Sequence, residues 1–330
     1  MKRVFFVAFI VLLTFGLIGC GGGGPQQVVG ESDSPLFDGS GDEYYMITFA
    51  SGIEYWQGAF QGFEAAAKMH GARVFYTGAP GTDINEQVTV FQQVAAMRPA
   101  GIALTCVEPQ GFVDAINDAI AQGIHVVTFD ADSPASNRYT YLGTGNENAG
   151  AAAAAHMARL LNGTGEVGVV MLPGLLNQEQ RSAGFVNYMR TYAPGINVVQ
   201  IANGGPDQTT AASATAALIQ ANPNIRGLFG VNAWQGTGIA TAVEEAGRAG
   251  IIQIVSFDTD QSTLDAIRNG TIQASVAQGT FQMGFWAFEM LYLTRKNQIV
   301  DNWQGRGLAP LPASVDTGVS IVTIDNVDNF

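Results

Sequence analysis

From residue 44 onward, short apolar runs alternate with longer stretches in which apolar residues recur every three or four positions. The short runs are rich in β-branched residues and predict buried parallel strands, whereas the longer stretches predict amphipathic helices. In the first half we expect strands at 45–50, 72–77, 101–105, 124–128 and 139–142, and helices at 56–70, 83–97 and 110–122. Strands that alternate with helices through short Gly/Pro connections predict a doubly wound parallel sheet.

A second series of the same kind begins where the first ends. We expect helices at 146–161, 179–192, 209–221, 234–246, 263–269 and 281–296, and strands at 166–171, 197–202, 227–231, 252–257, 272–277 and 319–324. Since the second copy already has its strands before residue 281, we expect the long helix at 281–296 to return and pack on the first domain. The chain would then cross between the domains more than once.

The predicted fold class is therefore α/β, with two doubly wound, Rossmann-like parallel-sheet domains joined by a hinge of several strands. We expect the first domain at 43–145 plus 279–315, and the second at 146–278 plus 316–330. The hinge is expected near 143–145, 278–279 and 315–317, where glycine and short polar residues can absorb a rotation.

One local motif occurs in both halves. The sequence VTFDAD at 127–132 returns as VSFDTD at 255–260, and each copy is a buried strand that ends in carboxylates. Ligands bind at the carboxyl ends of strands in open α/β sheets, so the repeat makes Asp130 and Asp258 candidate ligand contacts. For either residue alone, a turn or a helix cap is the alternative. Asp132 and Asp260, two positions further on, are expected to be turn residues.

The first residues have the pattern of an export signal. Met1-Lys2-Arg3 is basic, and the apolar run at 4–18 is short for a membrane span. The run ends in Leu-Ile-Gly-Cys at 17–20, which resembles the bacterial lipobox. This resemblance implies a lipoprotein signal peptide at 1–19 and acylation of Cys20; the alternative is an ordinary signal peptide cut elsewhere. More than one acyl chain gives stable attachment, so we expect a protein tethered to a membrane.

Residues 20–42 are rich in Gly, Ser, Asp and Gln and have no apolar periodicity, which predicts a flexible linker. Loss of residues 1–19 changes the formal net charge from −13 to −15. So acidic a protein repels nucleic acid and anionic lipid surfaces, and no nucleic-acid partner is expected. Cys106 lies in an apolar run and has no disulfide partner after Cys20 is acylated, so we expect it to be a buried apolar side chain.

Enzyme motifs are missing from the chain. The three histidines are far apart, and no HExxH, GxSxG or CxxC occurs. The Gly-rich junction at 143–150 lacks the spacing of a dinucleotide loop, no GxxxxGK[ST] is present, and neither Asp motif has the spacing of an EF-hand. We therefore expect no catalytic residue, metal or cofactor.

Six local motifs, in this order, resemble the type I periplasmic binding proteins of bacterial ABC importers for simple sugars, in the ribose-binding-like branch. They are TFASGIEYW at 48–56, VTFD at 127–130, QEQRSAGF at 178–185, GVN at 230–232, SFD at 256–258 and SVAQ at 275–278. The resemblance covers about residues 43–323. Two pocket positions depart from ribose-binding members, Ala131 in place of Arg and Ile53-Glu54 in place of Asn-Pro, so ribose itself is in doubt.

The resemblance implies a ligand set made of Tyr55, Trp56, Asp130, Arg181, Asn232, Asp258 and Gln278. Independently, carboxylates, a guanidinium and amides complement the donors and acceptors of a ring of hydroxyls, and aromatic rings cover the apolar face of a sugar. Core packing is the alternative for the aromatic pair, a solvated helix start for Arg181, and plain loop positions for the two amides. Trp234 is equally compatible with a core or a rim position.

The function that the resemblance implies is capture of a monosaccharide or related polyol and delivery to an ABC permease in the cytoplasmic membrane. The protein is expected to be exported, monomeric and lipid-anchored, at the outer face of that membrane or in the periplasm. A sensory receptor of the same fold, acting on a chemoreceptor or sensor kinase, is the alternative. A sugar-responsive repressor would need an N-terminal helix-turn-helix in place of the signal peptide.

Overall fold

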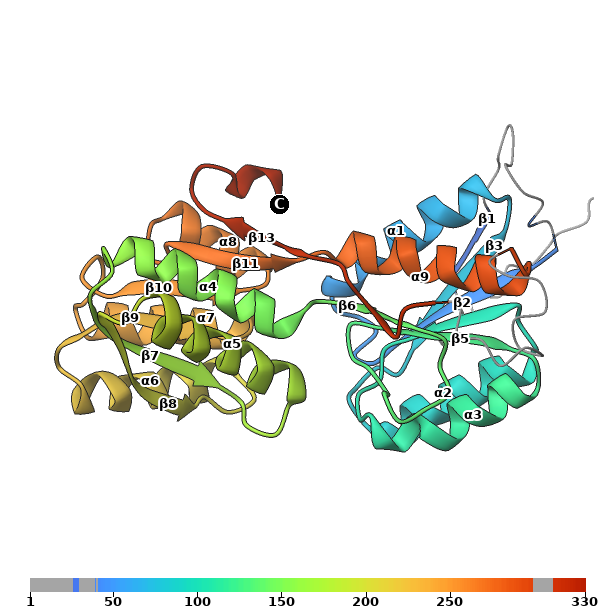
Figure 1. Ribbon diagram of the computed structural model, residues 1–330, viewed down its shortest axis with the longest axis horizontal. Helices are drawn as coiled ribbons and strands as arrows, with labels where there is room; N and C mark the ends of the chain where they lie inside the picture. Colours follow the sequence, from blue (N-terminus) through green and yellow to red (C-terminus); the bar gives the residue numbers. More distant parts are fainter. Residues whose placement is uncertain (1–25, 30–38, 40, 299–310) are drawn as a thin grey trace, which may run out of the picture.

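The computed structural model describes residues 26–29, 39, 41–298 and 311–330. It shows two α/β domains side by side, joined by three chain segments that run close together between them (Figure 1). The predicted fold class is therefore confirmed. The signal peptide and Cys20 lie outside the described residues. Within these residues, no helix has the length and apolar character needed to cross a membrane.

The N-terminal domain is built on a sheet in the order β1-β3-β2-β4-β5-β6-β12. Neighbouring strands are parallel, except that β1 runs antiparallel to β3. The strands are β1 (Gln26–Val29), β2 (Glu43–Thr48), β3 (Arg73–Gly78), β4 (Gly101–Leu104), β5 (His125–Phe129), β6 (Tyr141–Gly143) and β12 (Ser314–Asp316). Strands β2, β4 and β5 are covered on both faces, and this is why their sequences are nearly continuous apolar runs.

Helices cover both faces of this sheet. The pair α1 (Tyr55–Met69) and α9 (Thr280–Arg295) covers one face, and α2 (Ile84–Ala96) and α3 (Val113–Ala121) cover the other (Figure 1). Gly62 allows α1 and α9 to approach closely. A Cβ at this position would clash with the carbonyl oxygen of Phe281. The prediction that the long C-terminal helix returns to the first domain is confirmed.

The C-terminal domain repeats the design around a sheet in the order β13-β11-β10-β9-β7-β8, with only β13 antiparallel to its neighbour. Its strands are β7 (Gly165–Met171), β8 (Ile196–Asn203), β9 (Ile225–Gly230), β10 (Gln253–Phe257), β11 (Ala274–Gln278) and β13 (Val319–Val322). One face is covered by α4 (Asn146–Leu160) and α5 (Leu176–Tyr192). The other face is covered by α6 (Gln208–Ala221), α7 (Ala233–Glu245) and α8 (Gln261–Arg268).

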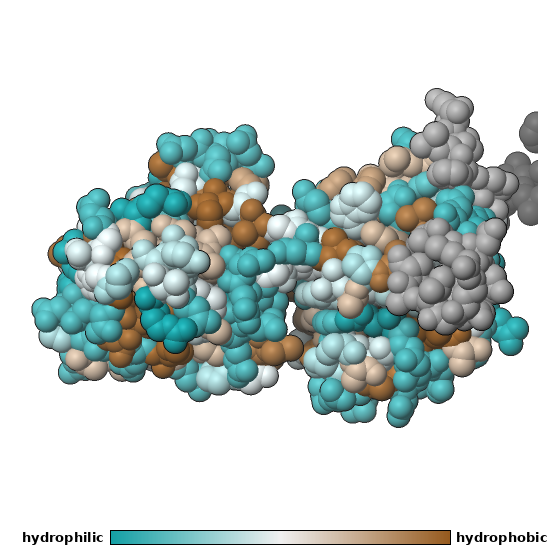
Figure 2. Space-filling model, in the orientation of Figure 1, coloured by the Kyte–Doolittle hydropathy of each residue, from teal (hydrophilic) through white to brown (hydrophobic). Residues whose placement is uncertain are grey.

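Three segments cross between the domains, from β6 to α4, from β11 to α9, and from β12 to β13. They are bonded to one another: the Thr317 N–H donates to the Gly143 carbonyl at 2.9 Å, and the Gly145 N–H donates to Asp316 Oδ1 at 2.8 Å. Figure 2 shows an opening between the domains on one side of these crossings. The crossings therefore form one compact hinge at the margin of a cleft.

Two strands were not anticipated. Strand β1 lies inside the segment expected to be a flexible linker, and it pairs with β3 through Gln26–Val29 at the edge of the sheet. That expectation is therefore wrong for these four residues. Strand β12 is short and pairs with β6, where only a hinge segment was expected. Neither strand has the apolar alternation that identifies a strand locally.

Candidate functional site

The predicted site residues come from strand ends and helix starts at the cleft edge of both sheets. Asp130 follows β5 in the N-terminal domain, whereas Asp258 follows β10 and Asn232 follows β9 in the C-terminal domain. Asp130 interacts electrostatically with both Arg181 and Asp258 across the domain boundary. The structure thus brings together charged groups that are up to 128 positions apart in the sequence.

The two repeated aspartates share an unusual backbone conformation. Asp130 has φ of 59° and Asp258 has φ of 67°, so both lie in the left-handed region. Among non-glycine residues, Asp and Asn adopt this region most readily. Each turn ends a strand abruptly and changes the direction of the carboxylate relative to the strand. The duplication seen in the sequence therefore extends to the local geometry.

Tyr55 and Asp130 form the N-terminal side of the site. The Tyr55 hydroxyl donates to Asp130 Oδ1 at 2.6 Å, and the Thr105 hydroxyl lies 3.5 Å from Oδ2. The Tyr141 hydroxyl donates to the Asp130 carbonyl at 2.7 Å. Burial raises the pKa of Asp130 to about 6, although the Tyr55 hydrogen bond and the Arg181 charge act in the opposite direction. This carboxyl group therefore releases its proton at a higher pH than an exposed aspartate does.

Arg181 is the cation of the C-terminal side. Its side chain is held in three directions: Nε donates to Asn146 Oδ1 at 2.8 Å, one terminal nitrogen to the Val231 carbonyl at 3.1 Å, and the other to Gln278 Oε1 at 3.1 Å. The guanidinium carbon lies 3.8 Å from the centroid of the Phe257 ring. With 4% of its surface exposed, Arg181 is not the solvated charge of the alternative reading.

Gln278 connects the charged groups to the hinge. Its Oε1 accepts from Thr144 Oγ1 at 2.7 Å as well as from Arg181, and its Nε2 donates to Asp258 Oδ1 at 2.7 Å. Burial raises the pKa of Asp258, while the charge of Arg181 and the hydrogen bond from Gln278 lower it. One N–H of the Gln278 amide is left for a ligand, so this residue is mainly a link between Arg181, Asp258 and the hinge.

Asn232 caps helix α7 and keeps free donors. Its Oδ1 accepts from the Gln235 N–H at 3.0 Å, which fixes the orientation of the amide. Its Nδ2 is buried and has no hydrogen-bond partner among the described residues. A buried amide left without partners costs free energy, so a ligand acceptor in the cleft would remove that cost.

Trp56 is buried in the core of the N-terminal domain. It is 2% exposed, and its ring packs edge-on against those of Phe49, Tyr55 and Phe129. As the second residue of α1, it lies on the helix face that covers the sheet. The core alternative therefore describes Trp56 in this structure, and Tyr55 is the member of the aromatic pair that reaches the site. Trp234 is 42% exposed, which excludes a core position.

The second carboxylate of each repeat has a structural role. Asp132 accepts from the Thr128 hydroxyl and forms a bidentate ion pair with Arg138. Asp260 caps helix α8 by accepting from the Thr263 N–H at 3.2 Å. Both contacts agree with the expectation of turn and cap residues, because each carboxylate is already used within its own domain.

Sequence reasoning missed four polar residues beside the site, namely Thr105, Tyr141, Thr144 and Asn146. Thr105 and Tyr141 contact Asp130, and Thr144 and Asn146 contact Gln278 and Arg181. Thr105 and Thr144 each come directly after a strand, so the rule that selected the two aspartates also applied to them. Asn146 had no such signal, because the Gly-rich junction around it was weighed only as a dinucleotide loop, whose spacing it lacks.

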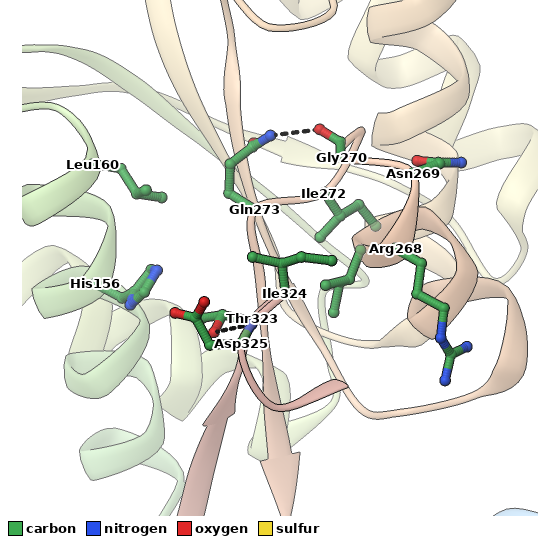
Figure 3. Close-up of a pocket in the computed structure, with 11 residues that line it drawn as sticks. His156, Leu160, Arg268, Asn269, Gly270, Ile272, Gln273, Thr323, Ile324 and Asp325 are labelled. Carbon is green, nitrogen blue, oxygen red and sulfur yellow. Dashed lines mark hydrogen bonds between the residues drawn. The ribbon is translucent and has the colours of Figure 1, made fainter. Parts of the chain in front are cut away.

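A hollow of about 470 Å³ lies elsewhere on the C-terminal domain. Figure 3 shows His156, Leu160, Gln273 and Ile324 around it, from α4, the start of β11 and the segment after β13. Gln273 directly precedes β11 and Gln278 ends it, so the two residues are about 16 Å apart at the rise of a strand. The hollow is therefore remote from the cleft. Among the described residues, no cluster of three or more His, Cys, Asp or Glu side chains is arranged to hold a metal.

The family model for the periplasmic binding protein domain matches residues 44–298. The chain belongs to the periplasmic binding protein family. Two solved structures of sugar-binding proteins resemble this chain. The first, the sugar-binding protein of a sugar ABC transporter from Bacillus halodurans, is 43% identical, with a TM-score of 0.85. That match covers 87% of this chain and 99% of the other chain.

The arabinose-binding protein AraP from Geobacillus stearothermophilus is 40% identical to this periplasmic binding protein, with a TM-score of 0.84. The alignment covers 88% of this chain and 99% of AraP. The D-ribose/D-allose-binding protein of Pseudomonas aeruginosa is 23% identical over 60% of this chain, and the match spans only 63% of that relative. These relatives are binding proteins for sugars.

Proposed function

We propose that this protein captures a monosaccharide in the cleft between its domains and delivers it to the permease of an ABC importer. The observation that supports this most is the division of the polar set, with Tyr55 and Asp130 on one domain and Arg181, Asn232 and Asp258 on the other. Neither domain alone offers a complete set of contacts. The full binding free energy is therefore available only when both domains contact the ligand.

The charge of the site favours a neutral polyhydroxylated ligand. Two buried carboxylates outnumber the single guanidinium, so an anionic ligand would be repelled. A hydroxyl group can donate to Asp130 or Asp258 and accept from Arg181 or from the unpartnered Asn232 amide.

Among monosaccharides, a pentose of the arabinose type is the first candidate. AraP, at 40% identity over almost its whole length, is described as an arabinose-binding protein. The departures at Ala131 and at Ile53-Glu54 also separate this pocket from the pattern typical of ribose-binding members.

Binding is proposed to act through hinge closure. We place the moving units at residues 43–145 plus 279–315 and at 146–278 plus 316–330. Rotation is assigned to the crossings at 143–145, 278–279 and 315–317, and Gly318, which follows the third crossing, has φ of 76°. The sugar selects the closed form because only that form makes both halves of the contact set. Closure also creates a joint surface from which a permease distinguishes loaded from empty protein.

Attachment to the membrane is proposed through Cys20, acylated after cleavage of residues 1–19. The protein would then act as a monomer at the outer face of the cytoplasmic membrane or in the periplasm, close to its permease. The lipobox-like sequence LIGC at 17–20 and the apolar run before it support this part of the proposal.

A thermal-shift screen tests the function directly. L-arabinose, D-arabinose, D-ribose, D-xylose and D-galactose would be compared at millimolar concentration, with calorimetry for those that raise the melting temperature. A sugar at one hundred times its Kd should stabilise the folded protein by about 2.7 kcal/mol. Asp258→Ala should abolish the shift, whereas Asp118→Asn on the exposed face of α3 should leave it unchanged. A shift produced only by charged metabolites, and by no neutral sugar, would refute the proposal.

A further inference from the structure

The crossing from β6 to α4 consists of Gly143, Thr144, Gly145 and Asn146. The first three are bonded to the other two crossings, through Thr317, Gln278 and Asp316. Asn146 differs, because its side chain contacts Arg181, the cation of the site. This stretch is also the Gly-rich junction that matches no nucleotide-binding motif, so its polar residue has no role in the function proposed above.

Asn146 lies next to Arg181 because α4 and α5 pack closely. A Cβ at Gly150 would clash with the carbonyl oxygen of Arg181, so glycine at this position allows the two helices to approach. Asn146 Oδ1 accepts from Arg181 Nε at 2.8 Å, and its Nδ2 lies 3.4 Å from Gln180 Oε1. The second contact orients the amide so that the oxygen, and not the nitrogen, faces the guanidinium.

The bond to Nε determines how the guanidinium is oriented. A guanidinium has five N–H groups in one rigid plane, and here three of them are used, by Asn146, the Val231 carbonyl and Gln278. Two N–H groups are left for a ligand. Without an acceptor at residue 146, Nε–H would be buried and unpaired, and the terminal nitrogens would be free to pivot about the remaining two bonds.

We propose that Asn146 is a positioning residue, which fixes the plane of Arg181 before the ligand arrives. This inference rests on the proposed role of Arg181 in sugar binding. A group that is oriented in advance loses less conformational entropy on binding, so the contribution of Asn146 appears as affinity although it contacts no sugar. Because Asn146 directly follows Gly145, which is bonded to Asp316, the guanidinium is also placed relative to the hinge.

The first test needs no ligand and uses the Arg181 Nε–H resonance in NMR spectra of the whole protein, assigned by its loss in Arg181→Lys. Wild type and Asn146→Asp both keep an acceptor oxygen at this position and should show a resonance protected from exchange with water. Asn146→Leu, of similar size, should lose that protection. Glu147→Leu, in the same first turn of α4 and exposed, is the matched control and should behave as wild type.

The second test measures affinity by calorimetry with the sugar found in the screen. Asn146→Leu should weaken binding by about tenfold or more, and Asn146→Asp should restore it to within about threefold of wild type. In an Arg181→Lys background, Asn146→Leu should have no further effect. If Asn146→Leu weakens binding equally in both backgrounds, or if Asn146→Asp does not rescue, its role is structural and the inference is wrong. Protection of Nε–H that survives in Asn146→Leu overturns it even if no sugar binds.

Discussion

Replacing Asp130 with asparagine should stabilise the ligand-free protein at neutral pH and weaken sugar binding. The change removes a charge with little change in shape: asparagine keeps an oxygen to accept from Tyr55, and it tolerates the left-handed backbone at this position. The charge of Asp130 is removed from water in the ligand-free protein, and we expect this desolvation to destabilise the fold. The two effects should therefore have opposite signs.

The magnitude follows from the titration of the carboxyl group. Burial raises the pKa of Asp130 from 3.8 to about 6, and each pKa unit corresponds to about 1.4 kcal/mol, which gives an upper limit of about 3 kcal/mol. Because Asp130 is only partly buried by surface area, we expect about 1–3 kcal/mol. A carboxyl group whose pKa is raised in the folded state binds its proton more tightly there than in the unfolded chain. The resulting stabilisation is fully present below pH 3.8. This contribution is lost as the pH rises through about 6.

Urea unfolding of wild type and Asp130→Asn at half-unit steps from pH 4 to pH 8 measures this effect. The advantage of Asp130→Asn should be near zero at the acid end, grow between pH 4 and pH 6, and level off above pH 7. Asp118→Asn, on the exposed face of α3, controls for loss of a carboxylate in general. A variant less stable than wild type at pH 7, or a difference that does not change with pH, would show that burial of the Asp130 charge is not costly. Calorimetry on the same variant should show sugar binding weakened by about tenfold or more.

Asp132→Ala should destabilise the fold by about 2–4 kcal/mol in urea unfolding, because it leaves the largely buried Arg138 without its carboxylate. It should leave sugar affinity unchanged. Equal loss of affinity in Asp132→Ala and Asp130→Ala would mean that the wrong carboxylate was assigned to the ligand. Cys20→Ala should release the protein from the membrane fraction of a lipoprotein-competent bacterium, and identical fractionation of both forms would exclude the anchor. Small-angle scattering should give a smaller radius of gyration with saturating sugar than without it, and an unchanged radius with binding confirmed by calorimetry would reject hinge closure.

Most of the fold could be predicted because parallel strands and their helices have strong local patterns. The strands of both cores are continuous apolar runs, and the structure places each expected strand and helix within a few residues of its predicted bounds. Strand β12 could not be predicted in this way. Its sequence, Ser-Val-Asp, is mostly exposed, and it becomes a strand only because β6 offers it a free edge. Pairing of this kind depends on tertiary structure.

The candidate site could be predicted in part. The repeat at the strand ends identified Asp130 and Asp258, but it did not predict that both would have positive φ. The burial of Trp56 had a signal in the sequence: it precedes Ala59 by three positions and Phe63 by seven, so it lies on the apolar face of α1. Asn146 was missed because its role depends on the packing of α4 against α5, which brings residues 35 positions apart into contact.

The same features that make this cleft selective make it unfavourable when empty. Both aspartates lie in a sparsely populated backbone region, burial raises both of their pKa values, and the Asn232 amide is buried without a partner among the described residues. The hydroxyl groups of a sugar donate to carboxylates and accept from amides. A bound sugar would therefore offset both the burial of the two carboxylates and the unpaired Asn232 amide. These groups lie on different domains, so the offset is complete only in the closed form. We infer that the free energy that favours closure comes largely from satisfying polar groups which each domain alone leaves incompletely paired, and this is why only a loaded receptor would present the closed surface.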